Sequence, residues 1–198
     1  MKDLSDLNNI AYLSVGSNMG DRLNNCTTGI RLLDETDDVR VEGISEYYLT
    51  EPVDFVDQAW FVNGAVKLST RLDPFGLLAL LKSIEFKVGR KKAEVRFGPR
   101  ILDFDIIFYN NEIIDTPQLV VPHPRMQCRE FVLRPVCDLS PGLVHPVLNK
   151  NIVQLIQEIK EGGPQCIRIN KYSQGEPLPV LRNPNTADQK EIANEVLY

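Results

Sequence analysis

The sequence predicts an α+β fold in which helices pack on an antiparallel sheet. Stretches with the apolar pattern of strands alternate with stretches of helical periodicity, in the order strand, helix, strand, strand, helix, strand. This is the order of the split-βαβ, or ferredoxin-like βαββαβ, arrangement, and shorter extra elements follow it toward the C-terminus. Both helices then lie on one face of the sheet, which leaves the other face free for a ligand.

The first three strands and the first helix are expected within residues 10–70. Residues 10–18 (IAYLSVGSN) are predicted as a buried strand. A helix follows from Asp21, with apolar residues at helical spacing: Leu23, Cys26, Ile30 and Leu33. The β-branched and aromatic residues of 39–51 favour a second strand, and the alternation in 59–70 favours a third.

The second helix is marked at both of its ends. Asp73 followed by Pro74 is typical of an N-cap and a first helical turn, and Gly89 is placed to end the helix. Between these ends, one apolar stripe runs along the helix: Leu77, Leu81, Ile84 and Val88. Residues 101–109 then supply the last strand of the core.

Three shorter elements follow the core. We expect a strand at 118–122, a helix around 129–138 and an amphipathic helix at 151–159. These elements extend the fold without repeating any earlier part of it.

A change in composition then divides the chain. Residues 1–160 are expected to form one domain, and residues 161–198 an appendage that is not an independent domain. Within the appendage, CIRIN at 166–170 favours an edge strand, and Thr186 resembles the start of a capped last helix. Its apolar residues favour packing against its own domain, so a monomer is favoured, with a dimer through this tail as the alternative. All the expected chemistry lies before Arg134, so the tail is expected to serve stability more than catalysis.

The composition excludes several classes of protein. The 198 residues are 43% hydrophobic and 25% charged, which is ordinary for a globular domain. The first ten residues lack the apolar core of a secretory signal, and no apolar run approaches the length of a membrane span. Four cysteines without a CxxC pair and only two histidines argue against a zinc site and favour a reducing cytoplasm. A net charge of −5 argues against a general nucleic-acid binder.

Cations nevertheless concentrate in one stretch of this acidic chain. Residues 87–100 hold six lysines and arginines and a single acid, Glu94. We expect such a stretch to meet a small polyanion. The glycines Gly89 and Gly98 favour a mobile lid that closes over this polyanion. A solvated loop is the alternative.

Two aspartates stand inside the last predicted strand, FGPRILDFDIIFY at 97–109. Alternation places one set of side chains toward the helices: Leu102, Phe104, Ile106 and Phe108. The other face receives Ile101, Asp103, Asp105 and Ile107. The two carboxylates then share a face, about 6.6–7 Å apart at Cα, where unpaired they would repel each other. Oxygen ligands without histidine or cysteine suit Mg²⁺ bound together with phosphate, and the adjacent cations complete the usual parts of phosphoryl transfer. A solvent-facing strand surface is the alternative.

Several motifs resemble one family in their order and spacing. RFGPRILDFDII (96–107) resembles the signature of the 6-hydroxymethyl-7,8-dihydropterin pyrophosphokinase family. Four further stretches occur in the family's order: YLSVGSNMGDR, YLTEPVDFVDQAWFVNGAV, IEFKVGR and VPHPRMQCREFVLRPV. The resemblance extends over residues 10–159.

The resemblance implies a reaction and its cofactors. Members of the family transfer the β,γ-diphosphate of ATP to the hydroxymethyl group of the dihydropterin in folate biosynthesis, giving AMP and (7,8-dihydropterin-6-yl)methyl diphosphate. ATP would be the co-substrate. Asp103 and Asp105 would hold two Mg²⁺ ions, and a metal pair positions both reactants and neutralises developing charge.

The resemblance also implies three sets of site residues. The catalytic positions are matched by Arg90, Arg100, Asp103 and Asp105. The pterin pocket, in which two aromatic rings would enclose a flat heterocycle, is matched by Thr50, Pro52, Val53, Phe61, Asn63 and Phe131. The ATP site is matched by Glu85, Lys92, Arg96, Arg100, Ile106, His123 and Arg129.

The sequence departs from the family's pattern at a few positions. Phe61 stands where a tyrosine is common, so a hydroxyl contact is lost there. Lys92 stands where relatives can carry arginine, whose fork grips phosphate more specifically. Gln118 and Val120 replace an arginine and a threonine that some members offer to the nucleotide.

Two other functions are compatible with such a fold. A palm-type nucleotidyltransferase or cyclase also carries paired aspartates, but it attacks the α-phosphate and would release pyrophosphate. An RNA-binding module would use residues 87–100 as a phosphate patch, but FVNGAVKL lacks the exposed aromatic residues of an RNP1-like strand. The expected partners are therefore ATP and the pterin, with no nucleic acid and no membrane.

Overall fold

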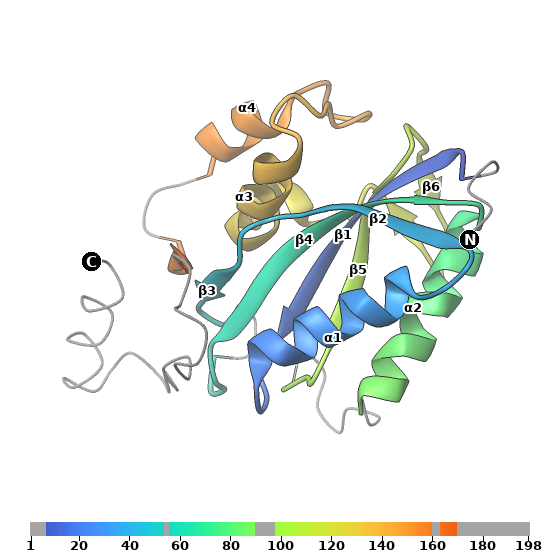
Figure 1. Cartoon of the computed structure of the whole chain (residues 1–198). Helices are drawn as coiled ribbons and strands as arrows, with labels where there is room; N and C mark the ends of the chain where they lie inside the picture. The colour runs from blue at the N-terminus through green and yellow to red at the C-terminus, as the bar shows by residue number, and fades with distance from the viewer. Residues whose placement is uncertain (1–6, 54–55, 90–97, 160–162, 170–198) are drawn as a thin grey trace.

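A computed structural model describes residues 7–53, 56–89, 98–159 and 163–169 (Figure 1). These residues form a mixed fold in which helices cover both faces of an antiparallel sheet. The sheet has six strands in the order β5-β1-β4-β3-β8, and β2 also pairs with β4. The mixed class and the antiparallel sheet agree with the prediction.

Strand β1 (Asn9–Ser17) lies inside the sheet, next to the edge strand β5, and is buried along most of its length. It pairs antiparallel with β4 (Phe61–Thr70) on one side and with β5 (Asp103–Tyr109) on the other. The strands predicted in these three places are confirmed. The side chains of β4 and β5 are therefore placed by their register with β1.

The strand predicted at 39–51 is divided in two. Strands β2 (Val39–Ile44) and β3 (Tyr48–Thr50) both pair with β4. Between them, the buried hydroxyl of Ser45 accepts a hydrogen bond from the backbone N–H of Ala65 at 2.8 Å. A side chain thus supplies one acceptor at the point where the ladder is interrupted.

Helices α1 (Arg22–Asp34) and α2 (Pro74–Val88) cover one face of the sheet (Figure 1). The side chain of Asp21 caps α1 and that of Asp73 caps α2, each by accepting a backbone N–H of the first turn. Gly89 ends α2 with φ of 114°, a left-handed conformation that favours glycine. Both predicted helices and their predicted ends are confirmed.

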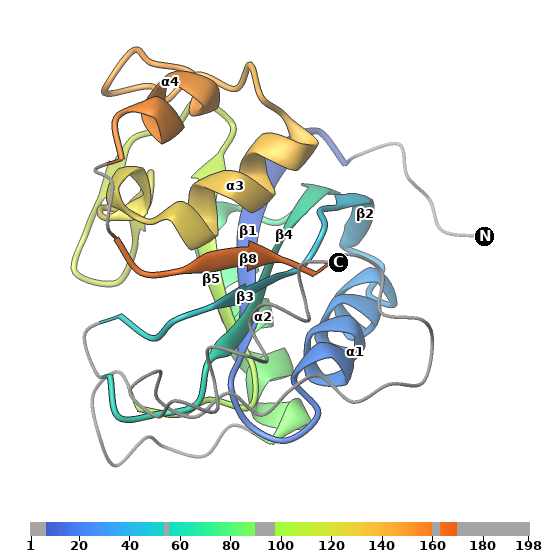
Figure 2. The same ribbon diagram turned by 90° about the vertical axis from the view of Figure 1, so that its left-hand side faces the viewer.

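Helices α3 (Glu130–Leu139) and α4 (Ile152–Gln157) lie over the opposite face, as the turned view shows (Figure 2). The two helices fall where helices were predicted. A second apolar core lies beneath them and consists of Tyr12, Ala65, Ile107, Phe108, Met126, Val132, Leu133, Val136, Ile152 and Leu155. The expectation that this whole face is free for a ligand is therefore wrong. Only the part beyond these helices is open.

A bulge in β5 changes the side on which its last residues lie. The pairing register shifts between Tyr12 and Leu13 of β1, which leaves Ile107 without a counterpart. Beyond the bulge, Phe108 packs beneath α3 and Tyr109 joins the core under α1 and α2. The predicted alternation is therefore wrong for Phe108, because an inserted residue exchanges the two faces.

The remaining described elements are short. Strands β6 (Ile114–Asp115) and β7 (Val120–Val121) form a small hairpin, and the 3-10 helix η1 (Met126–Cys128) precedes α3. Strand β8 (Cys166–Arg168) confirms the predicted edge strand. The basic residues 90–97 and the helix predicted from Thr186 lie outside the described residues. In the described ranges, no helix has both the length and the apolar character needed to cross a membrane.

Replacing Leu81 by alanine should lower the free energy of unfolding by about 2–5 kcal/mol, because this side chain is fully buried between α2 and the sheet. Urea denaturation measures the change. On the same helix, Phe86 is 76% exposed, and Phe86→Ala should alter stability by no more than about 0.5 kcal/mol. Equal losses in the two variants would contradict the packing described here.

Candidate active site

A cavity of about 270 Å³ opens on the uncovered part of the sheet. Ten residues predicted from the sequence line it: Thr50, Val53, Phe61, Asn63, Arg100, Asp103, Asp105, His123, Arg129 and Phe131. The structure adds five residues that were not predicted: Ser14, Gly16, Glu51, Gln58 and Arg125. Residues separated by more than a hundred positions in the chain therefore meet at one site.

The other predicted site residues are placed elsewhere. Pro52 is buried next to the cavity, while Glu85 and Ile106 are buried on the side of α1 and α2. None of these three lines the cavity. The predicted residues Arg90, Lys92 and Arg96 lie outside the described residues.

The register of the central strands puts the polar residues of the site into rows. Gly16 of β1 pairs with Asp103 of β5 on one side and with Asn63 of β4 on the other. In the next row, Ser14 pairs with Asp105. Since paired residues share a face, both carboxylates and the Asn63 amide point to the same surface.

Gly16 allows Asn63 to lie close to the backbone of β1. A Cβ atom on Gly16 would stand 2.4 Å from the Oδ1 atom of Asn63. The Nδ2 atom of Asn63 donates to the hydroxyl of Thr50 at 2.6 Å, and both residues are buried. The sequence alone did not indicate this contact, because the cross-strand neighbour of a glycine is set by register.

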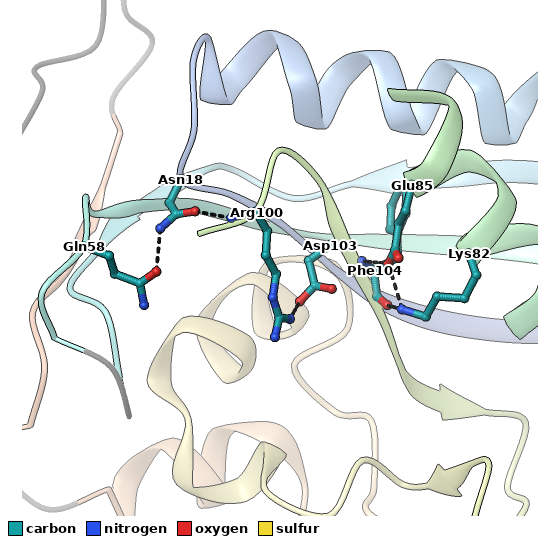
Figure 3. A network of polar contacts seen from close by, with 7 residues as sticks. All are labelled: Asn18, Gln58, Lys82, Glu85, Arg100, Asp103 and Phe104. Atoms are coloured by element: carbon teal, nitrogen blue, oxygen red, sulfur yellow. Dashed lines mark hydrogen bonds and ion pairs between the residues drawn. The ribbon is translucent and has the colours of Figure 1, made fainter. Parts of the chain in front are cut away.

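Asn18 connects two loops at the edge of the cavity (Figure 3). Its Oδ1 atom accepts the backbone N–H of Arg100 at 2.7 Å, and its Nδ2 atom donates to Oε1 of Gln58 at 2.9 Å. The guanidinium of Arg100 in turn contacts the carboxylate of Asp103. The segment that enters β5 is thus fixed just before the first aspartate.

The backbone of Phe104, between the two aspartates, is hydrogen-bonded by side chains of α2 (Figure 3). Glu85 is fully buried and accepts the backbone N–H of Phe104 at 2.7 Å. Lys82 donates to Glu85 at 2.8 Å and contacts the carbonyl oxygen of Phe104 at 3.3 Å. A buried carboxylate is costly unless it is paired, and these contacts pair it. Glu85 therefore supports the strand that carries the aspartates.

His123 lies beside the second aspartate. Burial lowers the pKa of His123 below its ordinary value; Asp105 opposes this shift, while Arg129 and Arg125 add to it. Its Nδ1 atom accepts the backbone N–H of Arg125 at 3.3 Å. The imidazole is therefore expected to be neutral, with its proton on Nε2.

The carboxylates of the cavity suit a metal ion whose remaining ligands come from the substrate and from water. In the part of the chain that the structure describes, no group of three or more His, Cys, Asp or Glu side chains could hold a metal ion. Mg²⁺ differs from Zn²⁺ in that it commonly binds through one or two carboxylates and completes its shell with phosphate and water. Asp103 and Asp105 fit this pattern.

Comparison with known proteins identifies the family. The sequence model of the 7,8-dihydro-6-hydroxymethylpterin-pyrophosphokinase family matches residues 12–141. The chain belongs to this family. The 2-amino-4-hydroxy-6-hydroxymethyldihydropteridine pyrophosphokinase of Bacillus subtilis is 48% identical over 133 residues, which cover 67% of this chain and 79% of that protein. The family name and this relative support pyrophosphoryl transfer to the hydroxymethyl-dihydropterin.

Some relatives of this chain are much longer proteins. The folic acid synthesis protein fol1 of Schizosaccharomyces pombe is 40% identical over 80% of this chain, but this chain spans only 22% of its length. Among solved structures, the wild-type HPPK-DHPS of Plasmodium falciparum with pteroate has a TM-score of 0.62 at 18% identity. That match covers 76% of this chain and 42% of the other, and it supports the fold alone.

Gly16→Ala should raise the KM for the hydroxymethyl-dihydropterin about tenfold, because the new methyl group displaces Asn63 from Thr50. Steady-state kinetics with the pterin varied measures this. Gly142→Ala is the matched control, since a Cβ there would meet no atom within 4 Å. An unchanged KM in Gly16→Ala would mean that Asn63 does not depend on this close approach.

Proposed function

We propose that this chain transfers the β,γ-diphosphate of ATP to 6-hydroxymethyl-7,8-dihydropterin, giving AMP and the pterin diphosphate used in folate biosynthesis. The observation that carries the proposal is the single cavity shared by the aspartate pair and five of the six residues matched to the pterin pocket. Membership of the pyrophosphokinase family supports it.

The pterin is proposed to lie over the Gly16 end of β1. Phe61 and Phe131 line the cavity from β4 and α3, and rings at two sides suit a flat heterocycle. The Asn63 amide, which lies between Thr50 and Gly16, offers a donor and an acceptor to the edge of the ring. The flat, polar-edged shape of the substrate matches both features.

The diphosphate is proposed to be transferred beside β5. Two Mg²⁺ ions held by Asp103 and Asp105 would neutralise the phosphate charge and bring the phosphates and the attacking hydroxyl together. Arg100 now contacts Asp103. When this carboxylate binds metal, the guanidinium becomes available to the transferring phosphates, where its fork stabilises the developing charge.

Further cations are proposed to bind the nucleotide phosphates. Arg129 lines the same cavity as the aspartates, beside His123. By the family pattern, Lys92 and Arg96 are assigned to the nucleotide and Arg90 to the transfer step. Ile106 and Glu85 act, in this proposal, through the position of β5 rather than by contact with ATP.

The finer architecture and the setting of the chain are also proposals. The strand order and the packing of α1 and α2 on one face support the ferredoxin-like arrangement. Residues 1–160 are proposed to form one domain, and residues 161–198 an appendage to it. The chain is proposed to act as a monomer, with ATP and the pterin as its partners. Four free cysteines support a reducing compartment, for which we propose the cytoplasm.

The proposed reaction is tested by incubating the chain with ATP, Mg²⁺ and the hydroxymethyl-dihydropterin. AMP and the pterin diphosphate should form in equal amounts. Release of pyrophosphate in place of free AMP would favour the palm-type alternative, and no turnover of ATP would contradict the proposal.

Asp103→Asn and Asp105→Asn should each lower kcat by at least about a hundredfold, because a metal contact contributes several kcal/mol to the transition state. Thermal stability should change little: each variant relieves the repulsion between the two carboxylates, and in Asp103→Asn this offsets the loss of the ion pair with Arg100. Asp115→Asn, on the exposed part of β6, is the control for the loss of a carboxylate. Near-normal turnover of either variant at saturating Mg²⁺ would exclude the two-metal assignment.

Arg100→Ala should slow the transfer step more than it weakens ATP binding, because the guanidinium lies beside the aspartates rather than at the far end of the nucleotide. Single-turnover rates and titration with an ATP analogue separate the two effects. If affinity falls and the transfer rate does not, Arg100 is a binding residue only.

A further inference from the structure

Strand β8 reaches the pterin side of the cavity from outside the family match. The family model ends at residue 141, whereas β8 spans Cys166–Arg168. It pairs antiparallel with β3 at the edge of the sheet, with Cys166 opposite Thr50 (Figure 2). Thr50 lines the cavity and holds Asn63.

The pairing continues into the loop that follows β3. The backbone N–H of Glu51 donates to the carbonyl of Gln165 at 3.1 Å. The backbone N–H of Gln165 donates to the Oε2 atom of Glu51 at 2.9 Å. Glu51 also lines the cavity, so two neighbouring residues of its wall are held by β8.

The strand is anchored on its other side as well. Arg168 forms an ion pair with Asp138 of α3 at 2.5 Å, and the hydroxyl of Tyr48 donates to the same carboxylate at 3.0 Å. Ile169 is only 6% exposed and packs with Leu49 in a small apolar cluster. A strand fixed to both β3 and α3 can hold the cavity wall in place.

We infer that β8 is a positioning element for pterin binding: by pairing with β3 it holds Thr50 and Glu51 where Asn63 and the substrate meet them. This inference rests on the proposed function. It gives the first part of the tail a role beyond the stability expected from the sequence. A three-residue strand such as β3 has few hydrogen bonds of its own, so a second paired neighbour restricts it strongly.

Loosening β8 should weaken the binding of the pterin and not that of ATP. In the sheet order β5-β1-β4-β3-β8, three strands separate β8 from the aspartates of β5. The described residues of β8 contribute nothing to the lining around Asp103 and Arg100. Loosening β8 should therefore change the KM for the pterin and leave nucleotide affinity alone.

Ile167→Pro tests the inference. The N–H of Glu51 donates to Gln165, and the N–H of Ile169 donates to the carbonyl of Tyr47 at 2.8 Å. Because hydrogen-bonded pairs alternate along an antiparallel ladder, Ile167 forms a hydrogen-bonded pair with Leu49. Proline has no N–H and removes that bond. We expect a rise of about tenfold in the KM for the pterin, with the Kd of an ATP analogue unchanged within about twofold.

Cys166→Pro is the matched control, because the N–H at this position points away from β3 and an edge strand tolerates proline there. It should show less than half the effect of Ile167→Pro. Should Ile167→Pro fail to fold, Ile169→Ala loosens the same strand through its packing and should raise the KM for the pterin about threefold.

The outcomes separate this inference from the proposed function. A wild-type chain that forms no AMP would overturn the proposed function and this inference with it. With an active wild type, an unchanged KM for the pterin in the folded variants would overturn the inference alone. So would equal losses of pterin and nucleotide affinity, which would show only a general loss of stability.

Discussion

The pairing of β1 with strands on both sides is the constraint on which the site depends. Because Gly16 stands opposite both Asp103 and Asn63, one row across three strands joins the first of the proposed metal ligands to the proposed pterin contact, and Asp105 lies in the next row. A slip of one residue in either register would turn these side chains into the core under α1 and α2. The alternation along β1 prevents such a slip, since Leu13 and Val15 face that core while Ser14 and Gly16 face the cavity.

Hydrogen bonds from α2 and from Asn18 hold the backbone on either side of Asp103 in place. The aspartates repel each other, yet the peptide between them is tied to the buried Glu85, and Lys82 balances the charge of that carboxylate. Asn18 fixes Arg100, three residues before Asp103, through two hydrogen bonds, and two more join Asn18 to the loop at Gln58. Both supports rest on a buried polar side chain, Glu85 or Asn18, whose donors and acceptors are paired. Positioning of this kind is what phosphoryl transfer requires of a protein.

The sequence predicted the elements of the fold because their signals are local. Asp73 with Pro74 and Gly89 marked both ends of α2, and the alternation before Ile107 placed Asp103 and Asp105 on one face. The bulge at Ile107 and the break at Ser45 were missed, since Ile107 favours a strand as much as its neighbours do and one serine does not by itself end a strand. Each irregularity is decided by the strand that it meets. The position of Glu85 behind β5, and the contact of Gly16 with Asn63, likewise depend on packing between distant segments.

The central claim is that one row of residues brings metal-bound ATP and the pterin together. A crystal structure with Mn²⁺, a non-hydrolysable ATP analogue and the hydroxymethyl-dihydropterin tests it most directly, because the anomalous signal of Mn²⁺ locates the ions independently of the protein. The account predicts two ions between the carboxylates of Asp103 and Asp105 and the phosphates, with the pterin over Gly16 between Phe61 and Phe131. Ions bound away from these carboxylates, or a pterin bound outside this cavity, would contradict it.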